Sequence, residues 1–277
     1  MEFALDPGLL VVLAAALTLG LARRAKPPRL RLELGSFPSR WRAVVATALL
    51  VLVVAVIVLR PIAAMVDPAE VVDLEGASFA RLFAAHAVLA AFLLAWWALA
   101  GFPPPAGFLS VPGPDLWRRL VIGVGAGVAV WVLTIGTMSL IGGLLVYLAG
   151  GFSGGGADAA AAVAPDAAGV VPEAVGYLVG LSVPKRLLLV ASAGLFEEAF
   201  FRSFLQPRAG LLLSTVLFTA SHAGYGSPLL LVGVFVLSLA LGRLFREQRD
   251  AIPCMVAHAV FDAIQLLVVL PVVAAAG

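Results

Sequence analysis

Residues 186–205 read RLLLVASAGLFEEAFFRSFL. This run matches the roughly 20 residues that an α-helix needs to cross the apolar core of a bilayer. Beyond Arg186 at its start, the charged residues in it are Glu197, Glu198 and Arg202. A charged side chain in hydrocarbon costs about 2.5–3.5 kcal/mol on insertion scales, so such residues are rare in membrane spans and usually have a function. We interpret the run as a transmembrane helix that carries a functional site.

The composition of the whole chain agrees with this interpretation. The chain has 277 residues, of which 62% are hydrophobic and 12% charged, and its mean hydropathy is +1.08. A soluble domain would carry about 25% charged residues. Eight apolar runs are long enough, or nearly so, to span a membrane: residues 8–22, 43–59, 79–101, 120–149, 186–205, 211–225, 228–242 and 251–270. The sequence therefore predicts an all-α, polytopic membrane helix bundle of about eight transmembrane helices.

The loop charges predict how the bundle is oriented. Residues 23–42 are rich in arginine, so by the positive-inside rule this loop is cytoplasmic and both termini lie outside. The basic residues flank apolar spans, so the net charge of +2 reflects topology and predicts the lipid bilayer as partner, with no nucleic acid. The preference for Arg over Lys, with abundant Ala, Val, Leu and Gly, is typical of a GC-rich bacterial genome. We therefore expect an integral protein of the bacterial inner (plasma) membrane.

The apolar runs leave the helix boundaries open in two places. The run 120–149 is longer than one span requires, and we expect Gly142 and Gly143 to break or tilt it. The runs 211–225 and 228–242 are short and nearly continuous, which fits either two tight helices or one re-entrant pair. The nearby glycines Gly123, Gly125 and Gly127 predict close helix packing.

Three polar motifs lie inside the last spans: EEAFFR at 197–202, FTASH at 218–222 and HAVFD at 258–262. If the inner ends of these helices lie at one level, a rise of 1.5 Å per residue places the acids and histidines about 10–16 Å deep. We therefore expect the three motifs to meet at one depth.

The spacing within each motif predicts its contacts. Glu198 and Arg202 are four residues apart and can pair, as can His258 and Asp262. Glu197 is turned about 100° from Glu198 and is free to face another neighbour. A carboxylate with a histidine can activate water for peptide hydrolysis, and further donors can stabilise the negative charge on the carbonyl oxygen. The candidate catalytic residues are Glu197, Glu198, Arg202, His222, His258 and Asp262.

The order EExxxR, FxxxH, HxxxD resembles the CAAX protease and bacteriocin-processing family (CPBP or Abi) of intramembrane endopeptidases. The resemblance implies a bundle of about eight helices, in which residues 184–270 form the catalytic core of one continuous membrane domain and residues 1–183 supply its N-terminal helices and loops. It implies that Glu197 is the catalytic glutamate and His222 its partner in water activation. His258 and Asp262 are similar to the pair that stabilises the oxyanion.

One departure from the family pattern bears on the mechanism. Some relatives have Asn at the last position, whereas Asp262 can donate a hydrogen bond only when protonated. Asp262 is therefore expected to orient His258 or to bind a metal. The second option predicts a metalloprotease with one zinc or similar divalent ion held by Glu197, His222, His258 and Asp262, since imidazole and carboxylate are zinc ligands.

The expected function is hydrolysis of a peptide bond in a membrane-tethered protein or peptide, such as a C-terminal sorting tail. Two alternatives are a non-enzymatic bacteriocin-immunity or scaffold protein and a proton-coupled transporter, although no internal repeat supports the transporter. Each motif could also be a structural ion pair or interhelical hydrogen bond. Two further residues are expected to have structural roles. His86 has no charged neighbour at helical spacing and is interpreted as a packing residue, and Cys254 is interpreted as a small buried thiol.

Overall fold

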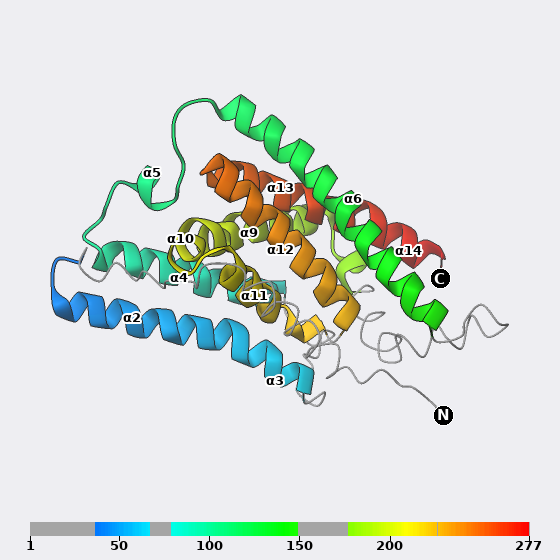
Figure 1. The fold of residues 1–277 in the computed structure, drawn as a ribbon, viewed down its shortest axis with the longest axis horizontal. Coiled ribbons are helices and arrows are strands. Elements are labelled where there is room, and N and C mark those ends of the chain that lie inside the picture. The colour runs from blue at the N-terminus through cyan, green and yellow to red at the C-terminus, as the bar shows by residue number, and fades with distance from the viewer. Residues whose placement is uncertain (1–36, 67–78, 149–176, 226, 277) are drawn as a thin grey trace.

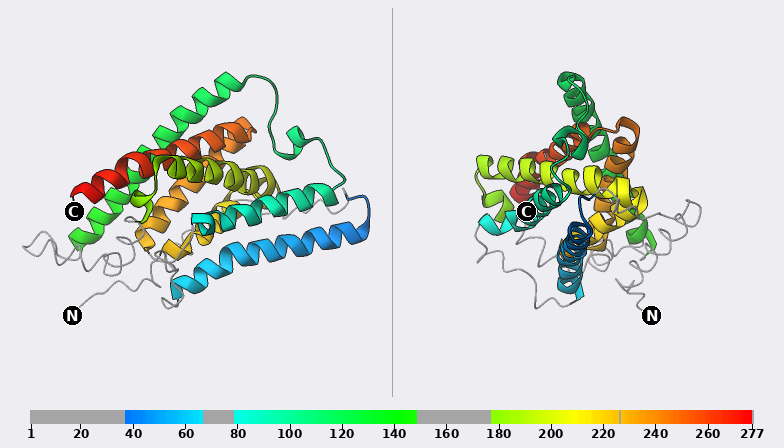
Figure 2. Two further views of the ribbon diagram at one scale, coloured as in Figure 1. Left: turned by 180° about the vertical axis from the view of Figure 1, so that it is seen from behind. Right: turned by 90° about the vertical axis from the view of Figure 1, so that its left-hand side faces the viewer.

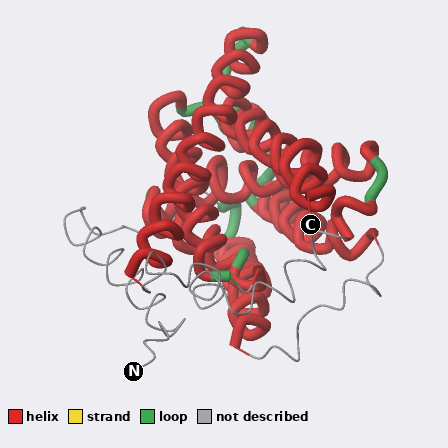
Figure 3. Tube along the Cα trace, turned by 90° about the vertical axis from the view of Figure 1, so that its right-hand side faces the viewer, coloured by secondary structure: helices red, strands yellow, loops and turns green. Residues whose placement is uncertain are grey.

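The computed structural model describes residues 37–66, 79–148, 177–225 and 227–276. Within these ranges the regular structure is entirely helical, and Figure 3 shows helices joined by short loops. In the part of the chain that the structure describes, four helices are long and apolar enough to cross a membrane: Arg40–Ala63, Leu116–Leu145, Pro228–Gln248 and Ala251–Val272. Two shorter apolar helices accompany them, Ala84–Leu99 and Leu211–Ser221. The prediction of an all-α, polytopic membrane bundle is confirmed, while the predicted span 8–22 lies outside the described residues.

The helices follow the predicted runs closely. In chain order they are α2 (Arg40–Val54) with a π-helical turn η2 (Ala55–Leu59) and α3 (Arg60–Val66), then the 3₁₀ turn η4 (Phe79–Phe83), α4 (Ala84–Leu99), α5 (Pro105–Phe108) and α6 (Leu116–Leu148). The C-terminal part comprises α9 (Val183–Glu198), the π-helix η5 (Ala199–Leu205), α10 (Gln206–Ala209), α11 (Leu211–Ser221), the 3₁₀ turn η6 (Ala223–Tyr225) and α12 (Pro228–Gln248). It ends with α13 (Ala251–Ile264), the π-helix η7 (Gln265–Val269) and α14 (Leu270–Ala276).

The helices stack in a series from one side of the molecule to the other. Figure 1 and the rear view in Figure 2 show α2 and α3 along one edge and α6 along the opposite edge, with the C-terminal helices between them. The contacts run in the same order: α2 packs on α4, α4 on α9, α9 on α13, and α13 on α6. The three sequence motifs therefore lie in the interior of the stack.

Two of the three expected glycine contacts hold α13 against α6. A Cβ atom added at Gly123 would lie 2.5 Å from Val256 Cβ, and one at Gly127 would lie 2.7 Å from the carbonyl oxygen of Ala257. No side chain larger than hydrogen fits at either position without moving α13. Gly125 has nothing within 4 Å, so the prediction of close packing is wrong for this residue.

The other face of α13 rests on a glycine as well. A Cβ at Gly194 of α9 would lie 2.7 Å from the carbonyl oxygen of Met255. Close approach at a small residue is the usual way in which membrane helices pack tightly. This contact brings α13 near enough to α9 for side chains of the two helices to share hydrogen bonds.

An aromatic cluster holds α4 against η5. The ring centroids of Phe92 and Trp96 lie 5.0 Å and 4.7 Å from that of Phe204, both in edge-to-face geometry. Such pairs contribute about 0.5–1.5 kcal/mol beyond the area that they bury. His86 belongs to the same buried stripe of α4 as these two aromatic residues, so the cluster also fixes where His86 points.

The structure corrects one prediction about the long fourth run and settles the question of the next two runs. α6 continues without interruption through Gly142 and Gly143 to Leu148, so the expected break is wrong. α11 has 11 residues and α12 has 21. At 1.5 Å per residue α11 is only about 16 Å long, roughly half the apolar thickness of a bilayer. They are separate helices, and α11 ends within the bundle.

Candidate active site

The helix α9 presents two acids in different directions. It begins after Ser182, with Pro184 in its first turn, where the missing N–H of proline removes no hydrogen bond. It ends at Glu198, and the chain continues as the π-helix η5, which carries Arg202. Turns of π-helix are rare and occur often at functional sites. Since successive helical residues point about 100° apart, Glu197 and Glu198 reach different partners.

Glu198 is the centre of a fully buried hydrogen-bond network. Its Oε2 accepts a bond from Arg202 Nε at 3.0 Å, and its Oε1 accepts one from His258 Nδ1 at 2.9 Å. Arg202 also donates from Nη2 to Ser238 Oγ at 3.1 Å, and its guanidinium carbon lies 5.2 Å from the centre of the Phe218 ring. Glu198 and Arg202 are both 0% exposed. With both of its oxygens bonded, Glu198 acts as an anchor for the third motif.

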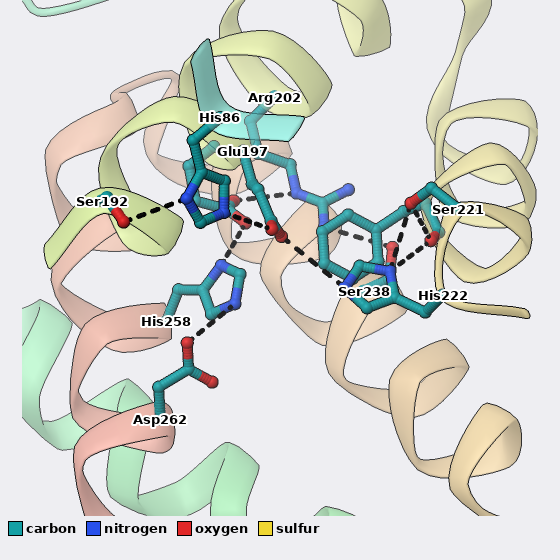
Figure 4. A network of polar contacts seen from close by, with 11 residues as sticks. His86, Ser192, Glu197, Arg202, Ser221, His222, Ser238, His258 and Asp262 are labelled. Atoms are coloured by element: carbon teal, nitrogen blue, oxygen red, sulfur yellow. Dashed lines mark hydrogen bonds and ion pairs between the residues drawn. The ribbon is translucent and has the colours of Figure 1, made fainter. Parts of the chain in front are cut away.

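This anchor fixes the orientation of the His258 ring. A carboxylate accepts only, so Nδ1 of His258 carries the proton that it shares with Glu198. The other nitrogen, Nε2, lies 3.6 Å from Asp262 Oδ2, as Figure 4 shows. The Asp262 side chain is a quarter exposed, whereas that of His258 is almost fully buried. Asp262 is thus placed to orient His258.

Glu197 lies between two histidines. Its Oε1 is 3.1 Å from Nε2 of His86, and its Oε2 is 3.8 Å from Nε2 of His222 (Figure 4). The second distance is too long for a direct hydrogen bond. Oε2 is buried and has no hydrogen-bond partner among the described residues. A carboxylate oxygen and an imidazole nitrogen that face each other at this separation can be bridged by a water molecule.

His222 is held in the orientation that this bridge requires. It follows directly after α11, and its Nδ1 lies 2.8 Å from the carbonyl oxygen of Phe218 and 3.1 Å from Ser221 Oγ. Since a carbonyl oxygen only accepts, Nδ1 carries a proton, and in the neutral ring Nε2 carries the lone pair. The ring also stacks on Phe218 at 4.6 Å. The lone pair therefore faces Oε2 of Glu197.

The structure brings all six predicted site residues together. The expected pair of Glu198 and Arg202 is present, and Glu197 faces other partners as its position on the helix predicts. The bond from His258 to Glu198 was not expected, because it joins two motifs that are 60 residues apart. Cys254 is fully buried, as predicted, and its thiol donates to the carbonyl oxygen of Leu241 at 3.5 Å.

The predicted metal ligands are not arranged around one point. Among the described side chains, no three of His, Cys, Asp or Glu form a group that could hold a metal ion. The donor atoms are directed elsewhere, because Glu197 Oε1 contacts His86 and His258 Nδ1 donates to Glu198. A zinc ion does not fit this arrangement of the described side chains, and the metal content stays a prediction for measurement.

His86 and Ser192 belong to the site although the sequence did not predict them there. The expectation that His86 is a packing residue is corrected by its contacts with Glu197 at 3.1 Å and with Ser192 at 3.0 Å. The sequence shows only neighbours along the same helix, whereas both partners of His86 lie on α9. The signal was nevertheless available, since an ionisable residue in a membrane span is by default a candidate for function.

The comparison with known families agrees with this geometry. Residues 180–264 match the family model described as Rce1-like, type II CAAX prenyl endopeptidase Rce1-like. The resemblance is confirmed over these residues. The Rce1-like segment runs from α9 to the end of α13, and hence contains all six predicted site residues. His86 lies outside it. No curated protein and no solved structure matches the chain.

Proposed function

We propose that the chain is an intramembrane endopeptidase that hydrolyses a peptide bond in a membrane-associated protein or peptide, using water activated by Glu197 and His222. The observation that carries the proposal is the buried, unpartnered Oε2 of Glu197, which faces His222 Nε2 at 3.8 Å. The Rce1-like segment supports protease activity at the level of the family. The helical bundle supports a membrane location for the reaction.

The reaction divides between the two sides of the site. Water between Glu197 and His222 gives up a proton to one of them as its oxygen attacks the carbonyl carbon, a role worth about 10²–10⁴ in rate. The same group then gives that proton to the leaving nitrogen as the C–N bond breaks, which leaves a carboxyl terminus and a free amine. His258, anchored through Nδ1 by Glu198, directs Nε2 into the site. When that nitrogen is protonated it can donate to the developing oxyanion. Asp262 Oδ2 lies 3.6 Å from that nitrogen and orients the ring.

The proposal locates the cleavage in the membrane. The site is built by side chains of α9, η5 and α13 and by His222 directly after α11, and its Glu198, Arg202 and His258 are buried in the bundle. A substrate must therefore present its scissile bond from a segment that enters or borders the bilayer, such as a hydrophobic tail that remains tethered. A C-terminal sorting tail in the inner membrane of a bacterium is the substrate that we favour.

Terminal proteomics of membrane fractions tests the proposal. Cells that carry the wild-type chain are compared with cells that carry Glu197→Gln, which keeps the size of the side chain and removes the base. We expect a defined set of membrane proteins to lose its processed termini, with processing lowered about 10²-fold or more. The matched control is Glu247→Gln, because Glu247 is an exposed residue that pairs with Arg243 on the surface.

The control shows whether an effect comes from the loss of Glu197 in particular or from the loss of any carboxylate. Glu247→Gln should leave every terminus as in the wild type. Identical termini in wild-type and Glu197→Gln cells would contradict the proposal and favour a non-enzymatic immunity or scaffold protein. Because the variant is compared at equal amounts in the membrane, a folding defect is not mistaken for a loss of activity.

A further inference from the structure

His86 approaches the candidate active site from outside the Rce1-like segment. It lies on α4, more than 100 residues before its partners, and the buried stripe of that helix directs it toward α9. Its side chain is only 8% exposed. Figure 4 shows the ring between Ser192 and Glu197, with one nitrogen toward each.

The hydrogen bonds on the two sides of the ring are mutually consistent. A carboxylate only accepts, so Nε2 of His86 carries the proton that it donates to Oε1 of Glu197 at 3.1 Å. With Nε2 as the donor, Nδ1 can accept from the Ser192 hydroxyl at 3.0 Å. One tautomer of the ring therefore satisfies both partners, with Ser192 as the donor to Nδ1 and Nε2 as the donor to Glu197.

This arrangement divides the two oxygens of Glu197 between two tasks. His86 occupies Oε1, and the carboxylate is thereby held so that Oε2 faces His222. Without the imidazole, the side chain of Glu197 can rotate about its last torsion, which is broad in energy. The oxygen that must face the water would then have no fixed position.

A purely structural role for His86 is less well supported by the packing. α4 already contacts η5 through Phe92, Trp96 and Phe204, whose rings are buried and in edge-to-face contact. An apolar residue at position 86 would maintain that interface without placing two polar groups in an apolar span. The hydrogen bonds of His86 are therefore better explained by what they do to Glu197.

We propose that His86 is a positioning residue of the endopeptidase, held by Ser192, and that it fixes the carboxylate of Glu197 for water activation. This inference rests on the proposed function. It adds α4 to the helices that build the site, so the catalytic apparatus extends beyond the segment that the family pattern covers.

The test compares His86→Leu, His86→Gln and Ser192→Ala with the wild type. Leucine keeps an apolar side chain on the stripe and removes both hydrogen bonds, whereas glutamine places an N–H donor near the position of Nε2. The matched control is Ser214→Ala, because Ser214 is a buried serine that donates to a backbone carbonyl, that of Phe201 at 2.8 Å, without touching His86. The readout is the rate at which newly made substrates gain processed termini in a pulse-chase experiment, per amount of folded protein.

We expect His86→Leu to slow processing about 10–100-fold, as misplacement of a catalytic group does. His86→Gln should recover most of the rate, Ser192→Ala should lose part of it, and Ser214→Ala should behave as the wild type. Wild-type rates in His86→Leu would overturn the inference. So would a His86→Gln protein that is folded but as slow as His86→Leu, because a donor at that position would then be irrelevant.

The remaining outcomes are also decisive. If His86→Leu does not accumulate, slower processing in Ser192→Ala than in Ser214→Ala supports the inference, and equal rates overturn it. If termini differ between the wild type and Glu197→Gln but do not respond to His86, the inference fails and the proposed function stands. If no termini respond to Glu197→Gln, both fail.

Discussion

Replacing Arg202 with alanine is the sharpest test of how the site is held together. Arg202 has no exposed surface, and it donates to Glu198 at 3.0 Å and to Ser238 at 3.1 Å while its guanidinium lies 5.2 Å from the ring centre of Phe218. Arg202→Ala leaves Oε2 of Glu198 without its donor, in a place that water does not reach. It also leaves the space of the guanidinium empty.

The magnitude follows from what remains. Removing one partner of a buried ion pair costs roughly 3–5 kcal/mol. Here His258 still donates to the other oxygen of Glu198 at 2.9 Å, so we expect the lower end of that range, about 3 kcal/mol. At 1.4 kcal/mol for each factor of ten, the unfolding equilibrium constant should rise about 100-fold.

The assay is equilibrium unfolding of the purified protein in mixed detergent, followed by tryptophan fluorescence. The control is Arg243→Ala, which removes an arginine from an exposed pair with Glu247 and should change stability by at most about 1 kcal/mol. The double variant Glu198→Gln, Arg202→Met removes both charges and should be more stable than Arg202→Ala, yet inactive, because the carboxylate that orients His258 is gone.

One result would refute this reasoning. If Arg202→Ala unfolds at the same detergent composition as the wild type and as Arg243→Ala, the two residues do not form a buried pair. If the double variant is less stable than the single one, the network holds the fold through its charges rather than through its packing.

Three further predictions concern packing, metal and orientation. Gly194→Val should separate α13 from α9, because even a Cβ atom there would lie 2.7 Å from the carbonyl oxygen of Met255; processing should fall together with thermal stability, and a fully active variant would contradict the packing argument. The arrangement of side chains predicts that exhaustive chelation leaves processing unchanged. The metal predicted from the sequence would instead be present if elemental analysis finds about one equivalent of zinc and if His222→Ala and His258→Ala both lose it. The loop charges place the end of α12 on the cytoplasmic side. A cysteine at the exposed position Glu247 should therefore react with a membrane-impermeant thiol reagent in broken cells but not in intact cells. Labelling in intact cells would show that the orientation is the opposite of the predicted one.

Several features of the site follow from sequence because they depend on one helix at a time. The pair of Glu198 and Arg202 is four residues apart on a single helix, and the helical repeat alone brings such residues within reach. The same holds for His258 with Asp262, and for the different direction of Glu197. The positions of the membrane spans likewise follow from local runs of apolar residues.

The length of α11 is an example of what local patterns do not show. The predicted run extends over residues 211–225, yet the helix ends at Ser221, directly before His222. The end depends on the neighbours of the helix, because a broken helix in a membrane is tolerated only where surrounding protein satisfies its backbone groups. The same limitation applies to the π-helix η5, whose residues carry no distinct signal.

The apolar runs and the spacing of the three motifs were enough to establish a membrane bundle with paired acids and histidines in its last spans. The tertiary structure alone revealed that Glu198, besides its pair with Arg202, accepts from His258 and that His86 holds Glu197. These bonds cross between helices that meet at Gly194 and at the aromatic cluster around Phe204. A helix carries its own periodicity in its sequence, but the neighbour that it meets is set by the packing of side chains that are distant along the chain.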